Sequence, residues 1–377
     1  MASASASAPG LYPGEVFETI AGFPTIYHYA PATTTQTPDA TPKPLIVCVT
    51  GGLHLARVFY GGHAGAAPQD FLAHHLNQRG FGVLSLSYPT ESNPPVMPLD
   101  AACVHFRVPD WGRQAAETTR RVVEAHSELK HAVVLISWSM GGRMVVPYAM
   151  EVRRLGLDVL QYISFAATPG LSSIRPLPPG MVCSPAGYFS VPMHVDAFWG
   201  QLKEMASRNG NRDSIPSDIY RREYAGATPI GLIGLGLRYD ADTRLYVADE
   251  IRHEDDTRVL DVGAYPLPTA LYPRSILDPS HALADRATWG FLLTYKLEAL
   301  IAELGGLAKL RESEAAASRW QKVMDLVHNA PERLSRPMNG NHFFFIGEQS
   351  AAETAAAVEN LIDDAVALQR ELKGFLE

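Results

Sequence analysis

Ser139 lies at the centre of a short segment with the residue types that nucleophilic catalysis by a serine needs. Residues 137–142 read Ser-Trp-Ser-Met-Gly-Gly, after the apolar run 132–136 and before the helix-like segment 143–152. A serine at the apex of a tight strand-to-helix turn holds its hydroxyl clear of the sheet, and small neighbours permit the strained backbone. The G-x-S-x-G pattern is imperfect, because Ser137 replaces its first glycine, and a buried strand ending in a polar turn is the alternative. We expect Ser139 to be a nucleophile.

His342 is the candidate for the base that takes the serine proton. A serine nucleophile needs such a base and an acid to orient it, and after a turn of this kind they follow in the order acid, then histidine. His342 is the last histidine of the chain, lies in the Gly/Asn turn 339–342 and precedes a helical pattern at 351–372. A surface or helix-capping histidine is the alternative, and the chain order favours the base.

Three aspartates compete for the role of the orienting acid. Asp278 lies a few residues beyond the candidate strand 268–273, where such a carboxylate normally projects. Asp285 is the rival, although a position as N-cap of the helix that follows explains it without catalysis. Asp240 follows the apolar run 231–237 and would serve if that run were a core strand. We favour Asp278 and keep the other two open.

Two backbone N–H groups should stabilise the negative charge that develops on the attacked carbonyl oxygen. One belongs to Met140, the residue after the nucleophile. The other should come from the loop 50–53, Thr-Gly-Gly-Leu, where glycines allow close approach of the backbone, and Gly52 or Leu53 is the expected donor. A plain Gly-Gly turn is the alternative, but both loops fall at the edge of the sheet where ligands bind in α/β folds.

Two further side chains lie next to these loops and are weaker candidates for the substrate pocket. His54 follows the glycine loop and either contacts substrate or has a structural role. Trp138 precedes the nucleophile and either forms a pocket wall or packs in the core. The adjacent His74 and His75 would point about 100° apart on a helix, which disfavours joint metal ligation. We expect no metal site and no cofactor.

The elements that must position these residues alternate along the first 170 residues of the chain. The chain has 377 residues, of which 46% are hydrophobic and 19% charged, and this composition supports a full globular core. Continuous apolar runs indicate strands buried on both faces, as in parallel sheets. The runs are 45–50, 81–86, 132–136 and 159–166, separated by helical patterns at 69–79 and 111–129 and preceded by short strands at 15–22 and 25–29. This alternation predicts an α/β fold.

A long segment in the middle of the chain interrupts this rhythm. Residues 170–263 carry clustered prolines and aromatics, with apolar runs such as 229–233 that would form strands, and they predict a lid or cap insertion. The core is then 15–169 and 264–377, and residues 1–14 form a disordered tail. After the insertion, the patterns predict a strand at 268–273 and helices at 286–304, 312–327 and 351–372.

The chain resembles the α/β-hydrolase superfamily. The resemblance rests on the loop 50–53, the turn 137–142 and Asn341-His342 ahead of the last helix. It covers residues 45–169 and about 265–373. It implies a mostly parallel sheet flanked by helices, and serine-dependent hydrolysis or acyl transfer on a carboxylic ester, thioester or lactone.

Within that superfamily, the chain is similar to the α/β hydrolases of fungal toxin and polyketide gene clusters. The shared features are residues 51–55, the Ser-Trp-Ser-Met-Gly-Gly turn and residues 278–283. The resemblance implies a hydrolase that forms an acyl-enzyme on Ser139 with a medium-sized apolar metabolite. An acyltransferase or cyclase of secondary metabolism with the same triad is the close alternative. A binding protein or lyase-type pocket on the same scaffold is the third.

Charge and cysteine usage exclude several other classes of protein. The net charge is −8, which gives no electrostatic support for a nucleic-acid partner. No run of 18 apolar residues occurs, so no membrane span is expected. The first ten residues lack the basic and apolar regions of a secretory signal. Cys48, Cys103 and Cys183 form no C-x-x-C pair, and we expect a reducing compartment, the cytoplasm.

Overall fold

The computed structural model describes residues 10–33, 43–126, 129, 132–171, 179–312 and 316–376. The tail predicted at 1–14 falls largely on residues 1–9, which lie outside these ranges. Within them, no helix has both the length and the apolar character needed to cross a bilayer.

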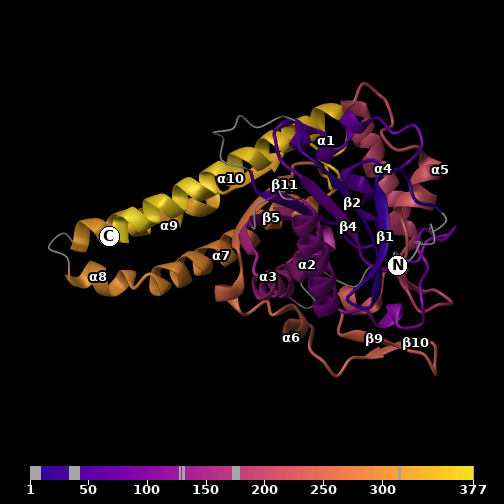
Figure 1. Ribbon diagram of the computed structural model, residues 1–377, viewed down its shortest axis with the longest axis horizontal. Coiled ribbons are helices and arrows are strands. Elements are labelled where there is room, and N and C mark those ends of the chain that lie inside the picture. The colour runs from indigo at the N-terminus through magenta and orange to yellow at the C-terminus, as the bar shows by residue number, and fades with distance from the viewer. Residues whose placement is uncertain are drawn as a thin grey trace.

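In the described ranges, a central sheet of eight strands forms the middle layer of the molecule (Figure 1). In spatial order the strands are β1 (Glu15–Ile20), β2 (Phe23–Ala30), β4 (Val83–Ser87), β3 (Leu45–Val49), β5 (Ala132–Trp138), β6 (Asp158–Phe165), β11 (Leu267–Pro273) and β12 (Ser335–Met338). From β4 to β12 neighbouring strands are parallel, whereas β1 and β2 form an antiparallel pair that joins β4. The expected mostly parallel sheet is confirmed.

Helices cover both faces of this sheet because alternate side chains of each strand point to opposite sides. Every residue of β3 is buried: Ile46 and Cys48 pack into one helical layer, and Val47 packs into the other. The apolar run that predicted this strand therefore reflects two covered faces. The first layer contains α1 (Leu72–Gln78) and α10 (Glu348–Leu376), and the second contains α2 (Val108–Ala125) and α3 (Val145–Arg154). Short helical turns at η1 (Ala56–Phe59), η2 (Pro68–Asp70) and η3 (Cys103–His105) connect these elements.

The segment between β6 and β11 adds no strand to the central sheet in its described part. The strand expected at 229–233 is wrong, because the chain forms a 3-10 turn at 230–232, where Pro229 and Gly231 disfavour a strand. The apolar run 231–237 leads into a separate two-stranded hairpin. The elements are β7 (Val182–Cys183), β8 (Phe189–Ser190), α4 (Pro192–Arg208), α5 (Ser217–Ile219), η5 (Tyr220–Tyr224), η6 (Ile230–Leu232), β9 (Leu237–Asp240), β10 (Leu245–Ala248), α6 (His253–Thr257) and η7 (Val262–Ala264).

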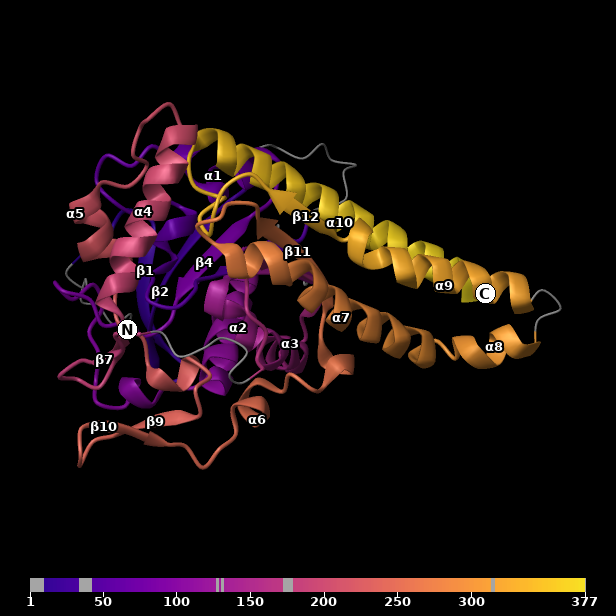
Figure 2. The ribbon, with the colours of Figure 1, turned by 180° about the vertical axis from the view of Figure 1, so that it is seen from behind.

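Four helices of the C-terminal part form an arm that projects from the sheet (Figures 1 and 2). They are the distal part of α7 (Pro279–Glu303), α8 (Gly306–Glu312), α9 (Ala316–Arg333) and the distal part of α10. The arm has its own apolar cluster, in which Leu297 and Leu368 are completely buried. Helix α7 begins at Pro279, seven residues earlier than the predicted 286, because proline suits the first helical position. Asp285 is therefore not an N-cap.

Candidate active site

Ser139 lies in the sharp turn where β5 ends, and its backbone has a φ of +56°. This left-handed conformation is disfavoured for residues other than glycine, and the surrounding structure must hold it. The 3-10 helix η4 (Ser139–Met144) follows at once and continues into α3, so strand and helix meet without a loop. The Ser139 carbonyl accepts a hydrogen bond from the Thr168 N–H at 2.8 Å, which ties the turn to the end of the neighbouring strand.

Small residues allow the chain to turn this sharply. A Cβ atom at Gly141 would lie 3.0 Å from the Cβ of Ser137, and one at Gly142 would lie 2.5 Å from the Thr168 carbonyl oxygen. A side chain at position 142 would thus collide with backbone, and one at position 141 would fit only if its neighbours shifted slightly. Ser137, which replaces the first glycine of the usual pattern, fits because its hydroxyl lies 2.9 Å from the buried hydroxyl of Tyr162.

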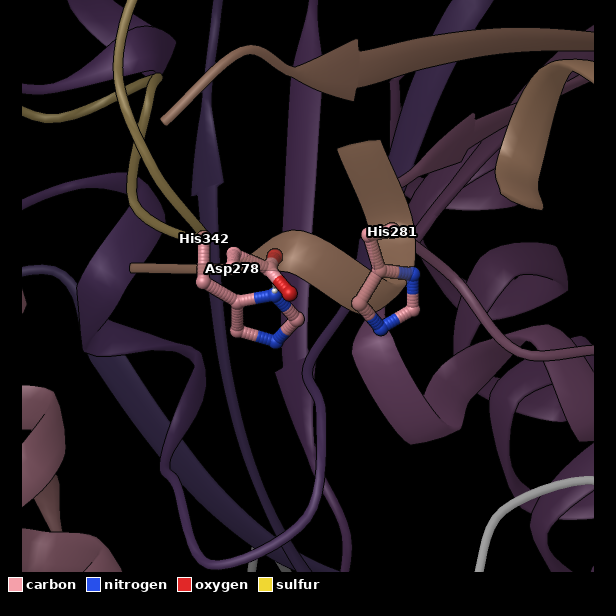
Figure 3. Close-up of side chains that lie close together, drawn as sticks. All are labelled: Asp278, His281 and His342. Carbon is pink, nitrogen blue, oxygen red and sulfur yellow. Dashed lines mark hydrogen bonds and ion pairs between the residues drawn. The ribbon is translucent and has the colours of Figure 1, made fainter. Parts of the chain in front are cut away.

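His342 and Asp278 form a buried hydrogen-bonded pair beside this turn. The Nδ1 atom of His342 lies 2.8 Å from Oδ2 of Asp278 (Figure 3). Both residues line the same cavity as Ser139. His342 is on the loop between β12 and α10, and Asp278 directly precedes α7. With Asp278 ionised, the Nδ1–H donates to the carboxylate, and Nε2 is the nitrogen that can accept a proton.

Neighbouring groups hold the His342 ring in place. The Nε1–H of Trp138 donates a hydrogen bond to the His342 carbonyl at 2.9 Å. Asn341, the preceding residue, donates to the Gln201 carbonyl of α4 at 2.8 Å. The Phe198 ring, also on α4, stacks on the imidazole with centroids 6.0 Å apart and 14° between planes. The described part of the insertion thus contacts the loop that carries the histidine.

The electrostatics of the pair favour a neutral histidine beside an ionised carboxylate. Burial disfavours the charged form of Asp278, but the charge and hydrogen bond of His342 outweigh it and lower the pKa of Asp278 to about 2. Burial lowers the pKa of His342 below its ordinary value, although Asp278 opposes this shift. A neutral imidazole held by a carboxylate is the form that can accept a proton from a hydroxyl.

Asp285 and Asp240, the two other candidates for the acid, form hydrogen bonds to residues other than His342. The carboxylate of Asp285 lies 2.9 and 3.0 Å from Nδ1 of another histidine, His281, one turn away on α7. Asp240 is in the hairpin of β9 and β10, where its carboxylate accepts hydrogen bonds from the Asp242 N–H and the Thr243 hydroxyl. Of the three aspartates, Asp278 is the one that the structure places in hydrogen bond with His342.

The glycine loop after β3 lies against the serine turn. A Cβ atom at Gly51 would lie 2.6 Å from the Cβ of Ser139, and Gly52, Leu53 and Met140 line the cavity with the serine. The Leu53 N–H already donates a hydrogen bond to the Thr228 hydroxyl at 2.8 Å. The Leu53 N–H therefore already has a hydrogen-bond partner within the protein.

His54 and Trp138 do not line this cavity. His54 is completely buried, with Nδ1 2.8 Å from the Gly52 carbonyl and Nε2 2.8 Å from the Tyr220 hydroxyl. Burial lowers the pKa of His54 to about 3, so the ring is neutral. His54 thus links the glycine loop to the insertion, and the completely buried Trp138 supports the His342 backbone. The structure gives both residues a structural position behind the site.

The cavity has a volume of about 400 Å³, within the range of small-molecule sites. The insertion contributes much of its lining, together with the core residues already named. Its apolar lining consists of Leu53, Met140, Phe189, Phe198, Ile233 and Leu235, and its further polar lining includes Arg143, Thr168, His194, Gln201, Ser280 and His281.

His281 is a site residue that reasoning from the sequence missed. It lies three residues after Asp278 and four before Asp285, a spacing that places all three on neighbouring turns once the helix is known to begin at Pro279. Because the helix was expected to begin only at 286, this spacing carried no meaning in the sequence.

No protein-family model and no curated protein sequence matches this chain. Among solved structures, it is similar to a bacterial heroin esterase, with 13% identity, a TM-score of 0.43, and coverage of 98% of this chain and 87% of the other. It is also similar to the thioesterase domain from the curacin biosynthetic pathway, with 11% identity, a TM-score of 0.43, and coverage of 92% of this chain and 98% of the other. A Pyrobaculum calidifontis esterase has 13% identity and a TM-score of 0.44, and the match covers 96% of this chain and 88% of the other.

The strand order and the position of the serine turn define the α/β-hydrolase fold. The turn follows a central parallel strand and opens a helix, and the acid and histidine loops follow β11 and β12 at the same end of the sheet. The resemblance seen in the sequence is thus confirmed for the fold.

Proposed function

We propose that this protein is a serine hydrolase that cleaves a carboxylic ester, thioester or lactone of a medium-sized apolar molecule through an acyl-enzyme on Ser139. The observation that carries the proposal is one cavity in which a strained serine turn meets a buried His342–Asp278 hydrogen bond. Backbone strain and burial of ionisable groups cost stability, and they concentrate at functional sites.

Acylation begins with attack of the Ser139 hydroxyl oxygen on the substrate carbonyl carbon. The serine proton passes to Nε2 of His342, and Asp278 stabilises the imidazolium that forms. The carbonyl oxygen becomes an oxyanion, which the N–H groups of Gly52 and Met140 stabilise. When the tetrahedral intermediate collapses, the bond to the leaving alcohol or thiol breaks and His342 returns the proton to that leaving group.

Deacylation repeats these steps with water. His342 accepts a proton from the water molecule that attacks the acyl-enzyme carbonyl, and the second tetrahedral intermediate collapses with release of the carboxylic acid. The Ser139 oxygen regains its proton from His342, and the site returns to its starting state. No further reactant is required.

The side chains that the insertion contributes to the cavity favour a substrate with apolar groups. Phe189, Phe198, Ile233 and Leu235 of the insertion line the cavity. We propose that residues 170–263 act as the lid that excludes bulk water and sets specificity. Burial of an alkyl or aryl group against these side chains stabilises the bound substrate by about 0.8 kcal/mol for each CH₂.

A fluorophosphonate probe tests the proposal directly. The probe should label the protein with a mass increase of one adduct, mapped by peptide mass spectrometry to Ser139. Ser139→Ala should abolish labelling. Ser280→Ala is the matched control, because Ser280 lines the same cavity, and it should be labelled like the wild type. A correctly folded wild-type protein that takes no label would instead favour a binding protein on this scaffold.

The pH dependence of the reaction should reflect His342. The neutral imidazole is the active base, so kcat/KM should rise as pH passes upward through the pKa of His342 and then level off. Burial is the largest effect and lowers that pKa, and His281 lowers it as well. The nearby carboxylates of Asp278 and Asp285 act in the opposite direction and raise it. The midpoint should therefore fall below the ordinary value of 6.5. A profile of an aryl ester from pH 4.5 to 9 measures it, and a midpoint well above 7 contradicts the assignment.

A further inference from the structure

The peptide groups on either side of Gly52 are both hydrogen-bonded to buried side chains. The Gly51 carbonyl accepts a hydrogen bond from the Tyr88 hydroxyl at 2.9 Å, and the Leu53 N–H donates to the Thr228 hydroxyl at 2.8 Å. Tyr88 and Thr228 are completely buried, and neither lines the cavity. The reaction proposed above gives neither of these two side chains a role.

The two hydroxyl groups also contact each other, and the direction of every hydrogen bond among them is fixed. The hydroxyl oxygens of Tyr88 and Thr228 lie 2.9 Å apart. A carbonyl oxygen only accepts, so the single hydroxyl proton of Tyr88 lies toward Gly51. The Thr228 hydroxyl then donates to Tyr88, while its oxygen accepts from the Leu53 N–H. A continuous chain of hydrogen bonds thus runs from the Leu53 N–H to the Gly51 carbonyl and encloses Gly52.

The Tyr88 hydroxyl keeps its proton across the pH range in which a histidine base works. Burial raises the pKa of Tyr88 above its ordinary value of 10.0, although the hydrogen bond with Thr228 opposes this shift. The chain of hydrogen bonds therefore keeps its direction throughout that range.

The bond from Tyr88 to the Gly51 carbonyl determines where the Gly52 N–H points. That carbonyl and that N–H belong to one peptide unit, which is trans and planar, so they point in opposite directions. Tyr88 holds the carbonyl end, and Gly52 lines the cavity together with Ser139. The Gly52 N–H therefore points away from Tyr88, and a rotation of the peptide unit would break the Tyr88 hydrogen bond.

Leu53 needs support from its surroundings because its backbone is strained. Its φ is +64°, in the left-handed region that is disfavoured for a leucine. The insertion supplies partners to both of its backbone polar groups, because Thr228 accepts from the N–H and the Gly226 N–H donates to the carbonyl at 2.9 Å. The Nδ1–H of His54 donates to the Gly52 carbonyl at 2.8 Å. The conformation of the glycine loop thus depends on residues of the insertion.

We propose that Tyr88 and Thr228 are positioning residues, whose hydroxyl groups orient the Gly52 N–H toward the oxyanion that forms during the reaction. Donors stabilise an oxyanion well only if they are oriented before the charge develops. Without the two hydroxyls, the peptide unit between Gly51 and Gly52 can rotate, because glycine restricts its backbone least of all residues. This inference rests on the proposed function, to which it adds the side chains that orient one donor.

Tyr88→Phe removes one hydroxyl and keeps the buried ring. It should lower kcat for p-nitrophenyl butyrate by about 10- to 100-fold, somewhat less than the loss of an oxyanion donor itself. KM should change by less than about threefold, because the interaction strengthens only in the transition state. Tyr148→Phe is the matched control, since Tyr148 is also completely buried and its hydroxyl lies 3.0 Å from that of Thr119, between α2 and α3. Its kcat should stay within about twofold of the wild type.

Two substitutions of Thr228 test the other hydroxyl. Thr228→Val keeps the shape of the side chain without the hydroxyl, and it should lower kcat by about tenfold or more. Thr228→Ser restores the hydroxyl and should keep kcat within about threefold of the wild type. Circular dichroism and the melting temperature show that each variant is folded at the assay temperature.

An alkyl trifluoromethyl ketone measures the stabilisation of the oxyanion without a leaving group. The Ser139 oxygen bonds to the carbonyl carbon, the serine proton passes to His342, and the carbonyl oxygen becomes the oxyanion. Its inhibition constant should rise in Tyr88→Phe and Thr228→Val by the same factor by which kcat/KM falls. The corresponding methyl ketone reports binding of the uncharged carbonyl, and its inhibition constant should be the same in all variants. A general loss of structure would change both constants.

The outcomes separate this inference from the proposed function. The inference is wrong if a folded Tyr88→Phe protein keeps the wild-type kcat and the wild-type inhibition constant of the trifluoromethyl ketone. It is also wrong if Tyr148→Phe loses as much activity as Tyr88→Phe. If Tyr88→Phe does not fold, the Thr228 pair decides, and equal kcat in Thr228→Val and Thr228→Ser overturns the inference. Failure of the proposed function looks different, because the wild type then turns over no ester and takes no fluorophosphonate on Ser139, and the inference falls with it.

Discussion

Replacement of His342 by alanine should lower kcat for an activated aryl ester by about 10⁶-fold, the size of effect that removal of a triad base has elsewhere. Without the imidazole, Ser139 loses the base that the proposed mechanism assigns to it, and its hydroxyl stays a weak nucleophile. The substitution also leaves the buried Asp278 carboxylate without its partner, so the melting temperature should fall. Turnover should therefore be measured well below that temperature, with circular dichroism to show that the protein is folded.

The control for this experiment is His194→Ala. His194 lines the same cavity but is half-buried on α4, and we propose no proton transfer through it. Its loss should change kcat by less than about tenfold. If a folded His342→Ala protein keeps more than a hundredth of the wild-type rate, His342 is not the base.

Asp278→Asn should lower kcat by about 10⁴-fold with little change in the fold. An amide is nearly isosteric with the carboxylate, but it carries no charge to stabilise the imidazolium. It also presents an N–H₂ that favours the wrong tautomer of His342. Since the pKa of Asp278 is about 2, the wild-type carboxylate is ionised throughout the working pH range, and the loss should appear at every pH from 5 to 9.

Asp285→Asn is the matched control for Asp278→Asn. Asp278 is the N-cap of α7 and Asp285 lies within that helix. Both carboxylates are buried, and each pairs with a histidine that lines the cavity. We expect Asp285→Asn to reduce kcat for a plain aryl ester by less than about tenfold. A collapse of the rate in Asp285→Asn with near-normal turnover in Asp278→Asn would reverse the assignment of the acid.

The core of the fold was predictable because its signals are local. The sequence of β3 is an uninterrupted apolar run because both faces of the strand are covered. The serine turn is recognisable from Ser139 and from the glycines at positions 141 and 142. The placement of His342 after the last strand also follows from chain order alone.

What could not be predicted depends on contacts between distant parts of the chain. The Leu53 N–H is occupied by the Thr228 hydroxyl, 175 residues away, so the glycine loop alone did not reveal which N–H remains. His54 looked like a pocket residue but faces Tyr220 of the insertion. The pairing of Asp285 with His281 became visible only with the helix start at Pro279.

Helix α4 of the insertion both lines the cavity and contacts the loop that carries His342. It accepts a hydrogen bond from Asn341 at the Gln201 carbonyl and places Phe198 on the imidazole of His342. A displacement of α4 large enough to admit a bulky substrate would also release the histidine loop. If His342 is the base proposed above, a movement of α4 would therefore change both the lining of the cavity and the position of the base. Replacement of the insertion by an unrelated one would therefore also require changes in the residues around His342.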